Sequence, residues 1–160
     1  MNPKKGFTLI ELLVVVAIVG ILAAVVMVAL TSARNKGGDA GVKSNLRNAI
    51  TQGEIFYNIN TVVPSSYTNV CTNGPIGSPA VNGIGAQVLA AAKANGYASY
   101  ATNAIGTTTT ATCNNSANGW AAEVPLKSAG TNQMWCVDWT GKSLQTNGST
   151  LSTSADVACN

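Results

Sequence analysis

The chain has no histidine among its 160 residues, and only 9% of the residues are charged. The lack of histidine excludes the common zinc ligand sets and any triad or acid–base pair that uses an imidazole. The nine basic residues are scattered and form no stripe with interleaved aromatic residues, which argues against a dedicated nucleic-acid module. We therefore expect no enzymatic activity, no cofactor and no metal site.

Proline is absent from residue 7 to residue 63, so no proline breaks a helix in this span. The span begins with an apolar run over residues 7–30 whose only charge is Glu11. At about 1.5 Å per residue this run forms a helix about 36 Å long, which is enough to cross about 30 Å of hydrocarbon. A soluble amphipathic helix has a polar face, and this run has none. The sequence predicts a membrane-spanning helix over residues 7–30.

A short basic leader, residues 1–6, precedes this helix and contains Lys4 and Lys5. An ordinary secretory signal places its small-residue cleavage site after the apolar run. Here the small residue Gly6 stands before the run, so cleavage between Gly6 and Phe7 would remove only the leader and keep the helix. An uncleaved signal anchor is the alternative that composition leaves open.

Glu11 is the one charged residue within the apolar run. A carboxylate deep in such a helix costs about 2.5–3.5 kcal/mol on insertion scales, so it usually has a partner. Cleavage after Gly6 would place the new α-amine of Phe7 one helical turn from Glu11. The two charges could pair within one chain or between staggered neighbouring helices, where the pair would set the axial register. The alternative is a carboxylate that reaches water at the membrane interface.

The stretch from Lys4 to Leu13, KKGFTLIELL, resembles the class III signal of type IV prepilins and type II secretion pseudopilins. The resemblance covers about the first 30 residues. It implies cleavage after Gly6 and N-methylation of Phe7 by a prepilin peptidase, and it implies that Glu11 engages the N-terminus of an adjacent subunit. Many members have a proline near the end of the apolar run; this chain has none there, and Gly20 is its candidate soft point.

Residues 31–62 continue the helical pattern after a weak point at Gly37-Gly38, and Val63-Pro64 ends it. Two separate helices with a loop between them are the alternative. We expect one apolar face of this segment to pack on a globular head; the face consists of Val42, Leu46, Ala49, Gly53 and Phe56.

The remaining residues predict a small head. Residues 63–118 are loop-like in composition, with one short helix over residues 86–94 that Asn95-Gly96 stops and an exposed polar loop over residues 107–118. Residues 119–160 predict an antiparallel sheet with strands over 120–127, 134–139 and 142–145. The fold class is therefore α+β and pilin-like, with a long N-terminal helix packed against a small C-terminal sheet.

Four cysteines, all in the C-terminal part, predict two disulfides in an oxidising compartment. Of the three connectivities we favour Cys71–Cys113 and Cys136–Cys159, because the second would tie the C-terminal tail to the sheet. Each would contribute about 3–4 kcal/mol by closing a loop. Pilins commonly carry a C-terminal disulfide loop, so the resemblance supports the second pair. Four reduced thiols are the alternative.

Three carboxylates of the head, Glu123, Asp138 and Asp156, have no EF-hand spacing, so we expect them to be structural or solvated. Trp120, Trp135 and Trp139 are more typical of a core or sheet face than of a ligand platform.

These patterns favour a structural subunit of a type IV pilus-like filament, polymerised through its N-terminal helix. Its expected partners are copies of itself, a prepilin peptidase, an assembly machine and, before assembly, the membrane. The cysteines and the resemblance place the head outside the cytoplasmic membrane and later on an extracellular fibre. A pseudopilin or minor pilin of a secretion or DNA-uptake system is the first alternative. A membrane-anchored binding domain that never polymerises is the second, and no feature supports DNA or a surface as its ligand.

Overall fold

The structure is a computed structural model that describes residues 6–77 and 80–160, so the leader lysines lie outside the described residues. The chain divides into two compact units, residues 1–34 and residues 35–160, and the second is the head. Helix α1 (Leu9–Ile59) contributes to both units. A long apolar N-terminal helix followed by a small sheet confirms the α+β fold.

The part of α1 in the head buries the predicted apolar face, since all five of its members lie on the buried side of the helix. The helix continues through Gly37-Gly38, where the sequence had suggested a weak point. It ends at Ile59, three residues before the expected boundary. Asn60 explains this end, because its side-chain oxygen accepts hydrogen bonds from the backbone of Val62 (3.0 Å) and Val63 (3.3 Å).

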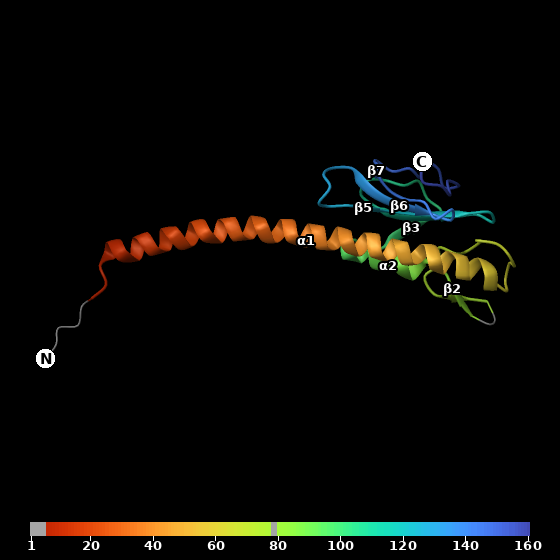
Figure 1. Cartoon of the computed structure of the whole chain (residues 1–160), viewed down its shortest axis with the longest axis horizontal. Helices are drawn as coiled ribbons and strands as arrows, with labels where there is room; N and C mark the ends of the chain where they lie inside the picture. Colours follow the sequence, from red (N-terminus) through yellow and green to blue (C-terminus); the bar gives the residue numbers. More distant parts are fainter. Residues whose placement is uncertain (1–5, 78–79) are drawn as a thin grey trace. The chain divides into compact units, whose positions relative to one another are not determined.

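The head contains a five-stranded sheet in the order β3-β4-β5-β6-β7. Helix α2 (Gly85–Ala94) and the head part of α1 lie on one face of this sheet (Figure 1). The β3–β4 pair is parallel and the other pairs are antiparallel. A separate hairpin joins β1 (Pro75–Ile76) to β2 (Val81–Asn82). The five strands are β3 (Tyr100–Thr102), β4 (Ala111–Asn115), β5 (Trp120–Pro125), β6 (Gln133–Asp138) and β7 (Ser143–Asn147).

The expectation of an exposed loop over residues 107–118 is wrong, because β4 lies within this segment and four of its five residues are buried. The polar residues that suggested a loop are satisfied inside the head. The Asn114 side chain donates to the carbonyls of Ala104 (3.0 Å) and Thr153 (3.0 Å) and accepts from the backbone N–H of Ala104 (2.9 Å). Since Thr153 lies 39 residues further along the chain, this compensation leaves no local sequence signal.

The C-terminal segment, residues 148–160, is held by polar groups of the sheet. The buried Glu123 carboxylate accepts from the Ser149 hydroxyl and from the backbone N–H of Thr150 (3.0 Å). The buried Asp138 carboxylate accepts from the backbone N–H of Cys159 (2.9 Å). Burial raises the pKa of the Glu123 carboxyl, although the donors from Ser149 and Thr150 act in the opposite direction. Both carboxylates are therefore structural.

Both expected disulfides are present in the structure. Cys71 and Cys113 join the loop before β1 to β4, with Cα atoms 5.7 Å apart. Cys136 and Cys159 join β6 to the end of the chain, with Cα atoms 5.8 Å apart. The second bridge fastens the same residue, Cys159, whose backbone N–H is bound by Asp138.

Gly53 permits the close approach of α1 to the sheet. A Cβ atom at this position would lie 2.7 Å from Nε1 of Trp120, which is fully buried on β5.

We expect Gly53→Ala to lower the free energy of unfolding by about 1–3 kcal/mol through overpacking. Gly37→Ala is the matched control, because a Cβ there meets no atom within 4 Å and alanine favours the helix. Urea unfolding of the full chain in detergent, followed by tryptophan fluorescence, measures both. Equal stability of Gly53→Ala and wild type would contradict the packing.

Asp39 of α1 fixes the turn after β5. Its carboxylate accepts from the Asn95 side chain (2.8 Å), from the backbone N–H groups of Lys127 (2.8 Å) and Ser128 (2.8 Å), and from the Ser128 hydroxyl. Burial acts to raise the pKa of Asp39, but these donors outweigh it and hold the pKa below the ordinary 3.8. The ionised form therefore stabilises the head above that value, and this stability is lost as the pH falls through the lowered pKa of the folded state.

We expect Asp39→Asn to be less stable than wild type at neutral pH and the difference to shrink below pH about 4. Glu123 titrates in both proteins, so its contribution cancels in the comparison. Urea midpoints of the two full-length proteins at neutral and acidic pH provide the test. A difference that does not change with pH would show that the charge of Asp39 contributes nothing.

Candidate functional site

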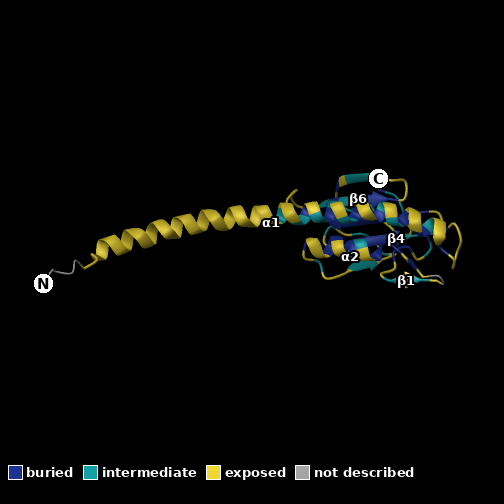
Figure 2. Cartoon of the chain, turned by 60° about the horizontal axis from the view of Figure 1, so that its bottom comes forward, coloured by how far each residue is buried: buried dark blue, intermediate teal, exposed yellow. Residues whose placement is uncertain are grey.

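The first unit presents an apolar helix surface that no described residue of the chain covers. From Leu9 to Leu30, the leucine, isoleucine, valine and methionine side chains are all exposed, and none is exposed by less than 48% (Figure 2). The helix is long and apolar enough to cross a membrane, and none of its most apolar window is buried within the described chain. A surface of this kind requires lipid or other apolar helices around it.

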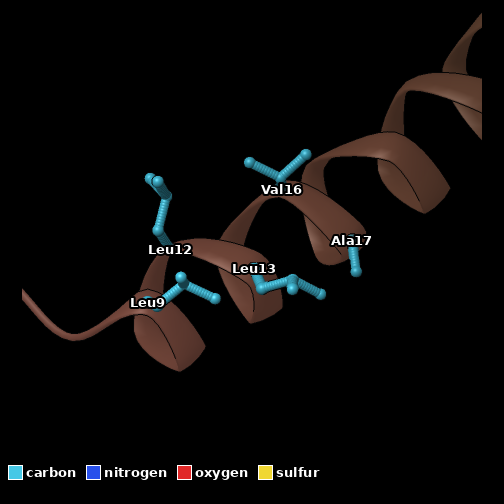
Figure 3. Close-up of a pocket in the computed structure, with 5 residues that line it drawn as sticks. All are labelled: Leu9, Leu12, Leu13, Val16 and Ala17. Atoms are coloured by element: carbon cyan, nitrogen blue, oxygen red, sulfur yellow. The ribbon is translucent and has the colours of Figure 1, made fainter.

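Two hollows lie along this surface, and each is lined in part by alanine. The first hollow, of about 390 Å³, lies among apolar side chains of the first turns (Figure 3). The second, of about 530 Å³, is lined by Ala24, Val25, Val28 and Ala29. Small residues beside large ones give a helix the holes that a neighbouring helix fills with its own side chains. The first hollow is lined by Leu9, Leu12, Leu13, Val16 and Ala17.

Glu11 has a partner within the chain. Its Oε2 atom accepts hydrogen bonds from the backbone N–H of Thr8 (2.9 Å) and from the Thr8 hydroxyl (2.8 Å). The Thr8 hydroxyl in turn accepts from the backbone N–H of Glu11 (3.3 Å), and the Thr8 carbonyl accepts the first helical bond, from Leu12. This is a capping box, in which Thr8 and Glu11 satisfy each other's free donors at the start of α1.

Thr8 is the residue that the sequence analysis missed. The local pattern Thr-x-x-Glu before an apolar run is a known signal for a capping box and could have identified it. The cap gives Glu11 a structural reason to lie in an apolar segment. It also leaves the carboxylate exposed at the end of the helix, where a cation from another chain can approach it.

Gly6 and Phe7 lie in irregular backbone immediately before the helix. Phe7 is 81% exposed, and a Cβ at Gly6 would meet no atom within 4 Å. Among the described residues, none packs over Gly6 or Phe7 in a way that would keep a peptidase from the bond between them. Nothing in the described fold requires glycine at position 6, so a requirement for glycine there would have to come from an enzyme that binds this bond.

The described residues contain no cluster of three or more side chains that could hold a metal ion. Asp156 serves its own loop, accepting from the Ser152 hydroxyl (2.8 Å) and the Thr153 backbone (2.7 Å). Glu123, Asp138 and Asp156 are thus each engaged by nearby residues of the head. The candidate functional site is therefore the exposed apolar helix with the Glu11 carboxylate near one end.

Comparisons with known proteins found similarity to a sequence motif and to a pilin. Residues 1–31 match the family model of the prokaryotic N-terminal methylation motif. The chain is also similar to the type IV wide pilus major component PilA4 of Thermus thermophilus, with 39% identity over 80 residues. The aligned region covers 50% of this chain and 61% of that relative, so the chain spans less than two thirds of its length. No solved structure matches.

Proposed function

We propose that this chain is a member of the type IV pilin family and the building block of a filament; the N-terminal methylation motif and the similarity to a pilin support this proposal. In this proposal a peptidase removes residues 1–6, Phe7 becomes the methylated N-terminus, and copies assemble through the apolar helix. The precursor lies in the cytoplasmic membrane with the head outside, and the assembled fibre is extracellular.

The observation that carries the proposal is the bare apolar surface of residues 9–30 together with its two hollows. Burying one large aliphatic side chain away from water contributes about 1.5–3 kcal/mol, so a mature chain that keeps this helix cannot remain a dissolved monomer. Lipid tails are as apolar as leucine, however, and provide no hydrophobic force between helices. Assembly from the membrane therefore depends on close packing into the hollows and on polar pairing.

Glu11 supplies the polar pairing in this proposal. Removal of the leader would create a cation at Phe7, and methylation of the amine keeps its positive charge. In the stored chain the Thr8 donors hold the carboxylate. In a filament the amine of a neighbouring chain would add a charged partner in surroundings of low dielectric constant, where an unpaired carboxylate is costly. Neighbouring chains misaligned along the helix axis would leave the Glu11 carboxylate unpaired.

Deletion of the gene in the cells that produce the protein is the direct test. We expect the deleted cells to lose a class of surface filament and a plasmid copy to restore it, with gold-labelled antibodies against the head decorating the fibres along their length. Label confined to fibre tips, or fibres with only a few copies, would indicate a minor pilin or pseudopilin. Unchanged fibres without label would overturn the proposal.

A further inference from the structure

The head carries an axial row of charges on α1. Lys36, Lys43, Arg47 and Glu54 follow one another at spacings of seven, four and seven residues. At 3.6 residues per turn these four positions fall within about 40° of one another around the helix. Lys36, Arg47 and Glu54 are exposed and Lys43 is half-buried. The row is thus positive toward its N-terminal end and negative at its C-terminal end.

The positive part of the row lines an open groove of about 340 Å³. Lys43 and Arg47 supply its charges, and Lys43 is positioned by Trp135, whose ring centroid lies 4.6 Å from its Nζ atom. In the described residues, neither cation donates a side-chain hydrogen bond to a carboxylate. The groove therefore offers an anion site that the chain itself does not fill. Its lining residues are Ala40, Lys43, Ser44, Arg47 and Asn48.

Glu54 is the anion best placed to occupy this groove from another copy. Three of the other head carboxylates, Asp39, Glu123 and Asp138, are buried by 96% or more, and Asp156 is bound within its own loop. Glu54 stands on an exposed helix position, and among the described residues its carboxylate accepts a side-chain hydrogen bond only from the Tyr67 hydroxyl, 2.9 Å away. Glu54 cannot reach the groove of its own chain, since Arg47 lies two helical turns away, about 10 Å along the axis.

We propose that Glu54 of one copy binds the Lys43–Arg47 groove of a parallel neighbour and so fixes the axial register of the heads. This inference rests on the proposed filament. In both charge pairs the cation precedes the anion in sequence: the Phe7 amine precedes Glu11, and Arg47 precedes Glu54. Pairing of Glu54 with Arg47 requires a parallel neighbour displaced by about 10 Å along the head part of α1. The contact is heterologous, so it leaves a free groove and a free carboxylate at opposite ends and does not close.

Charge reversal tests the pairing more strongly than alanine, because an exposed ion pair contributes little and like charges in contact are strongly unfavourable. We expect Arg47→Glu alone and Glu54→Arg alone each to lower the yield of sheared filaments by roughly ten-fold. Cells that express both variants together should recover the wild-type yield. In the mixture, position 54 of one kind of chain and position 47 of the other carry opposite charges, whereas within one kind these two positions carry like charges; Lys43 is the same in both kinds. The two chains should therefore alternate and occur in filaments in equal amounts by mass spectrometry.

Two controls separate this pairing from general effects. Lys93→Glu changes the charge by the same amount at an exposed position of α2 and should leave the yield unchanged. Tyr67→Phe removes the hydroxyl that binds Glu54 but keeps the carboxylate, and it should also assemble. If wild-type cells form no filaments of this chain, the proposed function fails. If wild-type filaments form and either the single variants also assemble or the mixture does not recover, the pairing is wrong and the proposed function stands.

Discussion

Replacing Glu11 by glutamine is expected to abolish filaments while leaving leader removal and membrane insertion intact. Glutamine keeps the geometry of the capping box with Thr8, since Glu and Gln both serve at this position, but it removes the negative charge. The amine of a neighbouring Phe7 would then have no charged partner in the filament core. We expect the yield of sheared filaments to fall by at least roughly a hundred-fold, because a charge buried without its partner costs about 3–5 kcal/mol.

Thr8→Val is the matched control for this experiment. It removes the hydroxyl that bonds Glu11 and keeps the charge, so it should weaken the start of α1 by about 1 kcal/mol and still allow assembly. Immunoblots of membranes would show whether each variant is processed and retained. Normal filaments from Glu11→Gln would show that the carboxylate acts only as a helix cap, and the register role assigned to its charge would be lost.

Replacing Gly6 by leucine is expected to stop leader removal almost completely. The uncleaved chain would keep Lys4 and Lys5 in front of the apolar helix and would lack the α-amine of Phe7. Because a Cβ at Gly6 meets nothing within the described fold, the loss could not be attributed to misfolding. We expect the full-length precursor to accumulate in the membrane and surface filaments to disappear.

Gly6→Ala distinguishes the size of the side chain from the mere presence of one. Alanine adds a single carbon, so we expect slower processing and a partial yield of filaments, between wild type and Gly6→Leu. Mass spectrometry of membrane fractions gives the ratio of precursor to mature chain for each variant. Efficient cleavage of Gly6→Leu, or filaments built from its precursor, would contradict the assignment of this bond.

The parts of the fold that could be predicted from the sequence depend on local periodicity. The spacing of Val42, Leu46 and Phe56 identified the buried face of α1, and Asn95-Gly96 correctly ended the short helix α2. Strand β5 was expected from the alternating apolar positions of residues 120–127 and strand β6 from the aromatic and β-branched residues of 134–139, and both form in the structure. In each of these segments the local pattern and the tertiary environment favour the same structure.

The parts that the sequence did not predict depend on distant partners. The sequence of strand β4 predicts a polar loop. The strand is buried instead, because the Asn114 side chain donates a hydrogen bond to the Thr153 carbonyl in the C-terminal segment. Asp39 and Glu123 likewise bond residues that are distant in sequence. The Thr8–Glu11 cap is different, since its signal is local and was overlooked beside the stronger signal of the apolar run. The sequence alone does not single out the charge row on α1, because it does not show that the other carboxylates of the head are buried.

We propose that the apolar helix is kept at maturation and forms the core of a fibre. Intact-mass and N-terminal fragment analysis of filaments sheared from wild-type cells tests it most directly. We expect the main component to begin at Phe7 with a methylated α-amine and to contain every residue of the helix that follows. A main component that begins at Met1, or a chain released singly into the medium with the helix removed, would contradict it.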